Sequence, residues 1–430
     1  MASKVFLQPL NGSLEACVRN CFDHFGGVDS MIKGNVFIKF NGTMQFKTAI
    51  TSTDVILSTI KVIQETSNEY DNIYVMDNSA VGSFTRVVFQ VDDLGKKVKQ
   101  LGAKPLFLDE EKAVDMDFKG TILDTPIPIP KIIYKNLVEN KNKNTYINIP
   151  RLKCHVLSKC TIAIKNQHGL LYDQEKVYRH DAIQEKIVDI MNVFTPDFNL
   201  VDASSVVNYG PMAIFDDWSI PMNLLISGID PVAVDTVGAH LIGIKNVEHI
   251  NLAAKRGFGT NNLEEIEILP SEELLKRYQI RLDHENIPEE IPDIIKIFKG
   301  TEKACKGGCS FLESLFLWFG TQGELKKGVG IYGKGHNKQE LDKYDGPFIV
   351  NGTCAVEELK SYFQARKKDE KITVYYIDDH LNIAEAGIAI RKAFGISLSD
   401  LKGLLPCSLI KMLFLMIIAK ARGGKFIPMR

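Results

Sequence analysis

The sequence predicts an α/β fold made of two domains with mostly parallel sheets. Short apolar runs typical of buried strands alternate with longer runs of helical periodicity, in the first 260 residues and again towards the C-terminus. Strands and helices that alternate in this way form parallel sheets with crossover helices. An acidic stretch with several prolines, residues 262–300, separates the two regions. We therefore expect a main domain over residues 1–295, a smaller domain over residues 296–430, and a cleft between them.

Strands and helices follow one another regularly in the first region. Residues 120–133 carry three alternating prolines, which suit an extended edge and not a central strand. Pro150 interrupts the fourth apolar run. The expected strands are residues 35–40, 72–76, 105–108, 146–152, 199–202 and 223–227. The expected helices are residues 52–66, 86–101, 182–193 and 231–243.

The second region repeats the alternation on a smaller scale and ends in an apolar helix. We expect strands at 348–351 and 372–377, and helices that begin near Val356 and Ala384. Residues 408–419 are strongly apolar but too short to cross a bilayer, which needs about 20 residues. A buried helix, an oligomer contact and a membrane-surface anchor all fit. Basic residues after this helix suit peripheral contact with the inner membrane face.

Composition narrows the class of protein. The chain has 430 residues, of which 45% are hydrophobic and 24% charged, as in an ordinary globular protein. The net charge of −1 argues against a nucleic-acid partner. The start lacks the apolar core of a signal peptide. The eight cysteines are not spaced as a disulfide framework. We therefore expect a cytoplasmic protein with reduced thiols.

Residues 144–180 concentrate the side chains best suited to chemistry. A strand ends near Leu152 and delivers Lys153 and His155 to the ligand-facing edge of the sheet. Lys165 and Asn166 follow two apolar residues, so burial would favour the neutral lysine amine. His180 precedes a helix, whose dipole favours a neutral, metal-binding imidazole. A polar loop beside a solvated helix face is the alternative interpretation.

Polar turns follow other expected strands of the first region. Asn41 and Thr43 follow the first strand, and Asn78 and Ser79 the second. Backbone N–H groups in such turns can cradle an anion, so all four residues are candidates for binding a cofactor. Asp202 ends a later strand and could orient a histidine or a lysine. Ordinary tight turns are the alternative, since neither a Walker loop nor a dinucleotide fingerprint is present.

Three cysteines of the second region form a candidate metal site. Cys305 and Cys309 flank two glycines that let the chain fold back, and Cys354 follows an expected strand. Thiolates so arranged can hold zinc or an iron–sulfur cluster, although a fourth ligand is missing. Buried reduced thiols are the alternative.

Several motifs together resemble a prokaryotic family known as domain of unknown function 362, over about residues 30–260. This resemblance implies an α/β fold and leaves the activity open. The motif residues are Lys153, His155, Thr161, Lys165, Asn166, Gly169, Asp202, Gly210, Pro211 and residues 230–235.

A more distant likeness is to lactate racemase. His155, nine residues, Lys165, fourteen residues and His180 repeat that family's spacing. The likeness implies that Lys165 carries a nickel-pincer-like nucleotide, that His180 binds the metal, and that His155 is an acid or base. The family's second histidine is replaced by the turn at residues 77–82, so two-base racemisation is not implied.

These observations favour a cytosolic small-molecule enzyme that depends on a cofactor or metal. It would move a proton or hydride at a carbon beside a carboxylate or hydroxyl, as an isomerase, racemase or oxidoreductase does. His155, Lys165 and Asp202 are the expected catalytic residues. Two alternatives remain: an iron–sulfur or metal-binding redox protein with a redox partner, and a non-catalytic anion-binding protein.

Overall fold

The computed structural model describes residues 3–67, 69–155, 157–179, 182–210, 218–282, 295–304, 327–369, 371–378, 383–396 and 406–426. Two compact units make up the chain: residues 1–284 with 406–426, and residues 285–405 with 427–430. Both units contain parallel strands flanked by helices, so the predicted α/β class is confirmed. The apolar tail helix, expected in the smaller domain, belongs instead to the first unit. The cleft expected between the domains stays a prediction.

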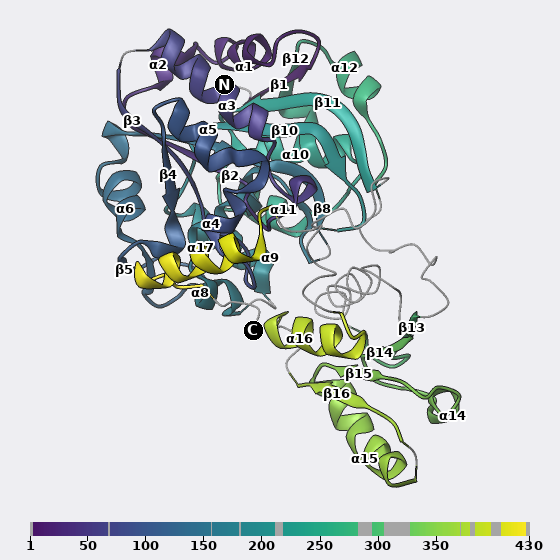
Figure 1. The fold of residues 1–430 in the computed structure, drawn as a ribbon. Coiled ribbons are helices and arrows are strands. Elements are labelled where there is room, and N and C mark those ends of the chain that lie inside the picture. Colours follow the sequence, from purple (N-terminus) through teal and green to yellow (C-terminus); the bar gives the residue numbers. More distant parts are fainter. Residues whose placement is uncertain are drawn as a thin grey trace. The chain divides into compact units, whose positions relative to one another are not determined.

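A mixed sheet forms the centre of the first unit (Figure 1), and within the described residues it has ten strands. Its order is β12-β1-β11-β10-β7-β2-β3-β4, with β8 and β9 joined beside β10. Strands β7, β2, β3 and β4 are parallel, whereas β11 runs antiparallel to β1 and β10. The bounds are β1 (Ser3–Pro9), β2 (Gly34–Phe40), β3 (Tyr70–Asp77), β4 (Lys104–Phe107), β7 (Thr145–Ile149), β8 (Arg151–His155), β9 (Lys159–Thr161), β10 (Phe198–Val207), β11 (Ser219–Gly228) and β12 (Ile266–Leu269).

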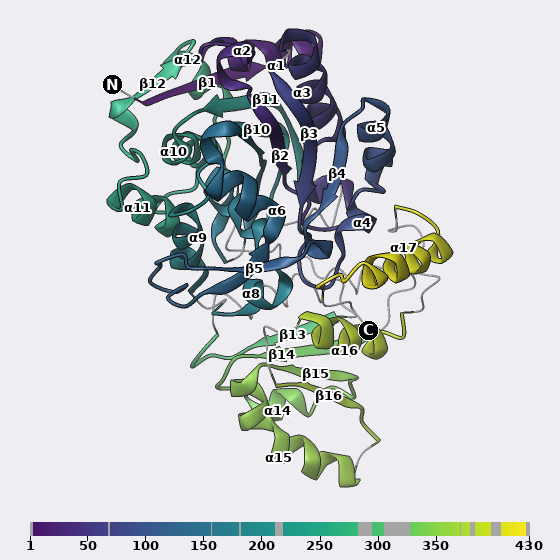
Figure 2. The same cartoon turned by 90° about the vertical axis from the view of Figure 1, so that its left-hand side faces the viewer.

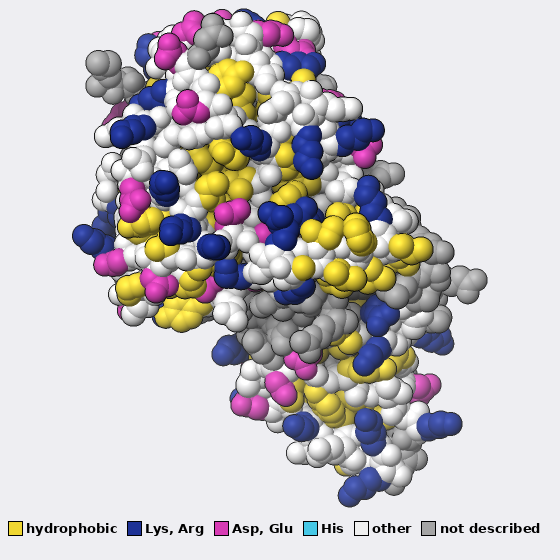
Figure 3. Space-filling model, turned by 60° about the vertical axis from the view of Figure 1, so that its left-hand side comes forward, with side chains coloured by type: hydrophobic (Ala, Val, Ile, Leu, Met, Phe, Trp, Pro, Cys, Tyr) yellow, Lys and Arg dark blue, Asp and Glu magenta, His cyan; other side chains and the backbone are white. Residues whose placement is uncertain are grey.

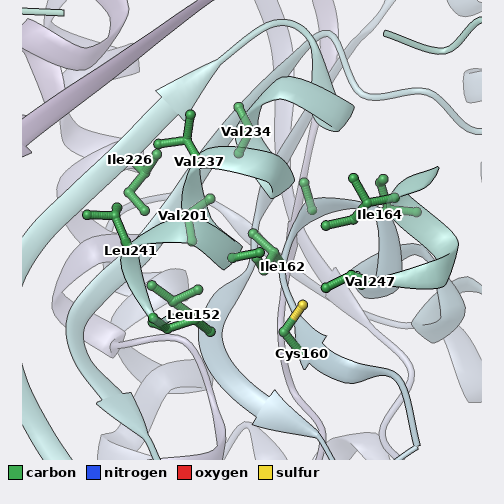
Figure 4. Close-up of a cluster of buried hydrophobic side chains, with 14 of the residues drawn as sticks. Leu152, Cys160, Ile162, Ile164, Val201, Ile226, Val234, Val237, Leu241 and Val247 are labelled. Atoms are coloured by element: carbon green, nitrogen blue, oxygen red, sulfur yellow. The ribbon is translucent and has the colours of Figure 1, made fainter. Parts of the chain in front are cut away.

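Helices cover both faces of this sheet. Helices α1, α3 and α5 lie on one face, and α9, α10 and α11 on the other (Figure 2). Each face of the sheet has its own hydrophobic core, the first under α1, α3 and α5 and the second under α9, α10 and α11. Successive residues of a strand point to opposite faces, so in β10 Leu200 belongs to the first core and Val201 to the second. Figure 4 shows the second core, where Leu152, Ile162 and Val237 meet. The bounds are α1 (Leu14–Asp23), α2 (Val28–Met31), α3 (Thr53–Thr66), α4 (Thr85–Val88), α5 (Leu94–Gln100), α6 (Lys131–Ile133), α7 (Ala163–Asn166), α8 (Asp173–Val177), α9 (Ile183–Met191), α10 (Pro231–Leu241), α11 (Glu248–Lys255) and α12 (Glu272–Tyr278).

Two expected elements differ in the structure. The single helix expected over 86–101 is divided into α4 and α5, because Asp92 and Asp93 adopt φ values of 47° and 57° that a right-handed helix cannot accommodate. The run 146–152 is divided at Pro150 into β7 and β8. The proline-rich segment does form an edge: β5 (Ala113–Met116) and β6 (Ile127–Pro130) pair antiparallel in a separate two-stranded sheet.

The second unit contains a parallel sheet of order β13-β14-β15-β16 within its described residues. Phe348 and Val350 of β15 pack against Leu359 and Phe363 of α15, which buries one face of this sheet. The predicted strands and helices of this region are confirmed. The bounds are β13 (Ile295–Lys299), β14 (Gly328–Tyr332), β15 (Phe348–Asn351), β16 (Val374–Ile377), α14 (Lys338–Leu341), α15 (Thr353–Asp369) and α16 (Ile383–Ala393).

Helix α17 (Leu409–Ala421) packs on α4 of the first unit through one face. Ala419 and the following Phe426 contact Phe84 and Val87. The opposite face is exposed and apolar, and Figure 3 shows it as a patch beside lysine and arginine side chains. Among the described residues, no helix is long and apolar enough to span a bilayer. The patch consists of Ile410, Leu413, Phe414 and Ile417, whose exposed fractions are 82%, 50%, 62% and 64%.

Candidate active site

A buried ion pair lies at the carboxyl ends of β2 and β3. Lys39 Nζ is 2.5 Å from Asp77 Oδ1, and both side chains are at most 3% exposed. The two strands are parallel neighbours, which brings their ends together. Burial lowers the pKa of Lys39 and raises that of Asp77, and the attraction between the two groups counters both shifts. The pair thus places fixed charge at the edge where open α/β sheets bind ligands.

Two glycines allow the backbone to approach this ion pair. A Cβ at Gly169 would lie 2.5 Å from Asp77 Oδ1 and 2.8 Å from Lys39 Nζ, and one at Gly42 would lie 2.8 Å from Asp77 Oδ2. The Gly42 N–H also donates to Asp77. Gly169 lies inside a short 3-10 helix, Gln167–Leu170. Close packing on the ion pair is what requires glycine there.

Asparagine amides connect the ion pair to the centre of the sheet. Asn41 Nδ2 donates to Asn166 Oδ1 (2.9 Å), and Asn166 Nδ2 donates to Asn148 Oδ1 (2.8 Å). Asn148 Nδ2 in turn donates to Asn199 Oδ1 (2.9 Å). The Thr43 hydroxyl donates to Asn41 Oδ1. The structure therefore brings the predicted residues Asn41, Thr43 and Asn166 together, and their hydrogen bonds to one another fix the shape of the site.

Two further buried lysines approach from other segments. Lys153 Nζ donates to the Ala49 carbonyl (2.7 Å) and to Thr43 Oγ1 (3.1 Å). Lys176 Nζ donates to the carbonyls of Asn78 (3.0 Å) and Ser79 (2.5 Å). The predicted turn residues Asn78 and Ser79 are therefore at this edge, where their carbonyl oxygens hold an ammonium group.

Lys165 extends from α7, whose start is fixed by a buried carboxylate. Asp235 Oδ1 and Oδ2 accept hydrogen bonds from the N–H groups of Ala163 (2.7 Å) and Ile164 (3.1 Å). Lys165 itself is partly exposed, and among the described residues its amine has no hydrogen-bond partner. Burial, with smaller contributions from Lys176 and Lys39, lowers the pKa of Lys165 to about 8. We name Lys39, Lys153, Lys165 and Lys176 the lysine cluster.

His155 ends β8 on the same face of the strand as Lys153, because side chains alternate along a strand. Its Nδ1 accepts hydrogen bonds from the N–H groups of Leu157 (3.1 Å) and Ser158 (3.4 Å). In the neutral ring the proton is therefore on Nε2. His180, the expected metal ligand, lies outside the described residues, so the convergence of both histidines on Lys165 stays a prediction.

Asp202 has contacts that suit an anchor. Its carboxylate accepts from Arg151 Nη1 (2.7 Å), the Ser52 N–H (2.7 Å) and the Ser204 N–H (3.0 Å), and it is fully buried. Burial favours a raised pKa, but Arg151 and these donors hold the pKa of Asp202 below its usual range. Asp202 thus links β8, β10 and the start of α3, and none of these bonds involves His155 or Lys165.

With this geometry established, the chain can be compared with known proteins. Residues 32–240 match the family described as Domain of unknown function (DUF362). The predicted resemblance is thereby confirmed for this part of the chain, and the whole lysine cluster lies within the DUF362 match. No curated protein matches. A crystal structure of a protein from Thermotoga maritima is similar at 11% identity and a TM-score of 0.37, covering 89% of this chain and 84% of that one.

Sequence reasoning missed several residues of the DUF362 region. Lys39 lies one residue before the end of β2, and Asp77 ends β3. A charged residue at the end of an apolar strand is rarely buried without a partner, and this could have marked both as site residues. The sequence around Lys176 does not predict that this lysine is buried, because the carbonyl groups that it contacts belong to the distant turn at Asn78 and Ser79. His249 is also buried, with Nε2 4.0 Å from Asp235 Oδ2, and burial lowers its pKa to about 3. His249 is therefore neutral beside the carboxylate that holds α7.

The cysteine site stays a prediction. Cys354 lies in the first turn of α15, and Cys305 and Cys309 lie outside the described residues. Within the described part of the chain, no three His, Cys, Asp or Glu side chains are grouped to hold a metal ion.

Proposed function

We propose that the first unit belongs to a cytoplasmic small-molecule enzyme that binds an anionic substrate or cofactor over the ends of β2 and β3. The observation that carries this proposal is the lysine cluster. Lys39 and Lys176 contact the carboxylates of Asp77 and Asp173, and Lys153 is bonded to hydroxyl and carbonyl oxygens. Four lysines gathered at one edge of the sheet favour binding of a carboxylate or phosphate.

Lys165 is the proposed reactive group. An amine with a pKa near 8 is about one-tenth neutral at pH 7, whereas a lysine of pKa about 10.4 is almost entirely charged. The neutral amine can add to the carbonyl carbon of an anionic substrate and release water, which leaves an imine. The imine acidifies the adjacent C–H bond, whose proton leaves to solvent, and the Nε2–H of His155 is the proposed hydrogen-bond donor that holds the substrate.

A cofactor joined to Lys165 is a second way to use the same amine. Among the described residues the Lys165 amine has no hydrogen-bond partner, and this, together with its partial exposure, fits covalent attachment. A nickel-pincer-like nucleotide would supply a hydride acceptor when bound. The lysine cluster would then hold its anionic groups, and the Nε2–H of His155 would donate a hydrogen bond to the substrate.

Reductive trapping tests the role of Lys165. The protein is incubated with a panel of 2-oxo acids and borohydride, and peptides are mapped by mass spectrometry. We expect an adduct at Lys165, absent in Lys165→Arg, which keeps the charge but removes the nucleophilic amine. Lys159→Arg is the matched control, since that lysine lies in the same segment but bonds the Lys245 carbonyl. Acylation of Lys165 should also have its midpoint near pH 8.

The outcomes separate the remaining alternatives. Adducts spread evenly over surface lysines, with no dependence on residue 165, would refute the imine proposal. An added mass at Lys165 in protein purified without oxygen from its natural source would support the cofactor. Saturable carboxylate binding without any adduct or turnover would support the non-catalytic anion-binding protein.

We also propose that α17 rests on an anionic membrane surface. Its exposed apolar face adjoins Lys411 and Lys420, and the helix contains no acidic residue. Such a helix binds the lipid interface through apolar burial and through attraction to anionic headgroups. Sedimentation with phosphatidylglycerol vesicles should carry the protein down, and Phe414→Asp should prevent this. Equal sedimentation with neutral phosphatidylcholine vesicles, or of the variant, would contradict the proposal.

A further inference from the structure

A cavity of about 220 Å³ opens at the start of α3. Lys153 of the lysine cluster donates to the carbonyl of Ala49, which lies between two residues of the cavity wall, Thr48 and Ile50. Its wall comes from distant parts of the first unit: residues 51–53 before and at the start of α3, Arg151 of β8, Ser205 of β10 and Ser219 of β11. Most of these side chains end in a hydroxyl group. A wall of hydroxyl groups with one guanidinium donates hydrogen bonds from several directions.

Two polar atoms of this wall are buried without a partner. Arg151 and Thr53 are each 4% exposed, and both line the cavity. Within the described residues, Arg151 Nε and Thr53 Oγ1 have no hydrogen-bond partner. Folded proteins pair nearly all their buried polar atoms, because an unpaired one costs about 1–3 kcal/mol. Two such residues in the wall of one cavity fit a bound group that accepts hydrogen bonds once these side chains turn towards it.

The start of α3 adds backbone donors. The helix begins at Thr53, and its N-cap residue Ser52 makes no side-chain capping bond. The N–H of Ser52 is already bonded to Asp202, so the first-turn N–H groups that follow it are the ones available to a ligand. The helix dipole makes this end electropositive and favours an anion.

Three basic side chains lie in the cavity wall or behind it. Arg151 is balanced by Asp202, and Lys47 by Asp92, 3.0 Å away. Behind the wall, the Lys153 amine donates to hydroxyl and carbonyl oxygens. Burial, with smaller contributions from Lys165 and Arg151, lowers the pKa of Lys153 well below its ordinary value.

We propose that this cavity binds the phosphate group of a small-molecule ligand. The proposal does not depend on the chemistry of Lys165, but the two sites share a wall: Thr51 Oγ1 accepts a hydrogen bond from the Asn41 N–H (2.8 Å). A ligand held here by its phosphate can therefore extend towards the lysine cluster. Free inorganic phosphate and a phosphomonoester present the same tetrahedral oxyanion to these donors.

Isothermal titration of the full chain with inorganic phosphate, at constant ionic strength, tests the site. We expect saturable binding that Thr53→Val weakens about tenfold, which is about 1.4 kcal/mol. Stability should not fall, because the lost hydroxyl has no hydrogen-bond partner among the described residues. Thr59→Val is the matched control: it lies in the same helix, but its hydroxyl donates to the Val55 carbonyl (2.8 Å), and phosphate affinity should be unaffected.

Lys165→Arg separates this site from the lysine cluster. Phosphate affinity should persist in that variant, and a phosphomonoester such as glycerol phosphate should compete with inorganic phosphate. No saturable binding at millimolar phosphate would overturn the proposal, as would equal losses in Thr53→Val and Thr59→Val. Binding that is lost in Lys165→Arg but kept in Thr53→Val would also overturn it, because the anion would then sit in the lysine cluster.

Discussion

The two units place different residues at the ends of similar sheets. In the first unit, parallel strands β2 and β3 end in a buried ion pair, with three more lysines nearby. In the second unit, β14, β15 and β16 end in the neutral residues Tyr332, Asn351 and Ile377, and β13 ends in Lys299, which is exposed. Both sheets satisfy the same packing rules, so the fold does not require the charges. We infer that the charged residues at the strand ends of the first unit serve a function.

The cost of burial supports this interpretation. A buried ion pair adds little net stability, because removing both charges from water offsets their attraction. Apolar side chains of similar size would serve the core equally well. The first unit thus carries buried charged residues that folding alone does not select, whereas the one charged residue at the described strand ends of the second unit, Lys299, is exposed.

Breaking the ion pair should have the largest effect. Lys39→Met leaves the Asp77 carboxylate buried and unpaired, so we expect a loss of about 3–5 kcal/mol in unfolding free energy. Urea unfolding followed by the fluorescence of Trp218, in a Trp318→Phe background, reports on the first unit. Adding Asp77→Asn should recover part of the loss. If the double variant is no more stable than Lys39→Met, an unpaired charge is not the cause.

The second-largest effect should be a pH dependence of stability in the first unit, caused by the buried carboxyl group of Asp109. Burial, with a smaller contribution from Glu110, raises the pKa of Asp109 to about 6, while Thr85 and Lys176 oppose the shift. The native state then holds this proton more tightly than the unfolded state. Its contribution is complete below pH about 4 and is lost as pH rises to about 6, amounting to about 2–3 kcal/mol.

Asp109→Asn should remove this decline, measured as the difference between wild type and variant across that pH range. The difference is needed because His249 acts in the opposite direction: its neutral native form loses stability as pH falls below about 6.5. Parallel stability curves for both proteins would show that Asp109 is ionised normally.

Gly169→Ala should cost somewhat less. The added methyl group meets Asp77 and Lys39 at 2.5 and 2.8 Å, and crowding of this kind costs about 1–3 kcal/mol. Gly12→Ala, where no atom lies within 4 Å, is the control and should leave the melting temperature nearly unchanged. Similar shifts in both variants would point to a backbone effect and not to the ion pair.

Asn351→Leu in the second unit should have the smallest effect. Asn351 is 4% exposed, and its Oδ1 has no partner among the described residues. Replacing it with an apolar side chain of similar size should change stability by less than about 1 kcal/mol. A large loss would show that the strand ends of both units carry essential polar groups.

Local pattern predicted the elements well and the partners of the charged groups poorly. Val55, Ile56, Ile60 and Ile63 marked α3 because helical periodicity is local. The turn residues Asn41 and Asn78 were found because strand ends share one edge. No local pattern predicts which distant carbonyl groups accept hydrogen bonds from a lysine. The tail helix was misassigned for the same reason, since its apolar residues do not specify the surface they cover.

The return of α17 to the first unit has a consequence for synthesis. Residues 409–421 complete the surface around Phe84, yet they leave the ribosome only after the whole second unit has been made. At about 5–20 residues per second, the α4 surface waits for many seconds with its apolar side chains uncovered. The first unit is thus a discontinuous domain with the second unit inserted in it, and premature termination within the insert would release a chain that displays this surface.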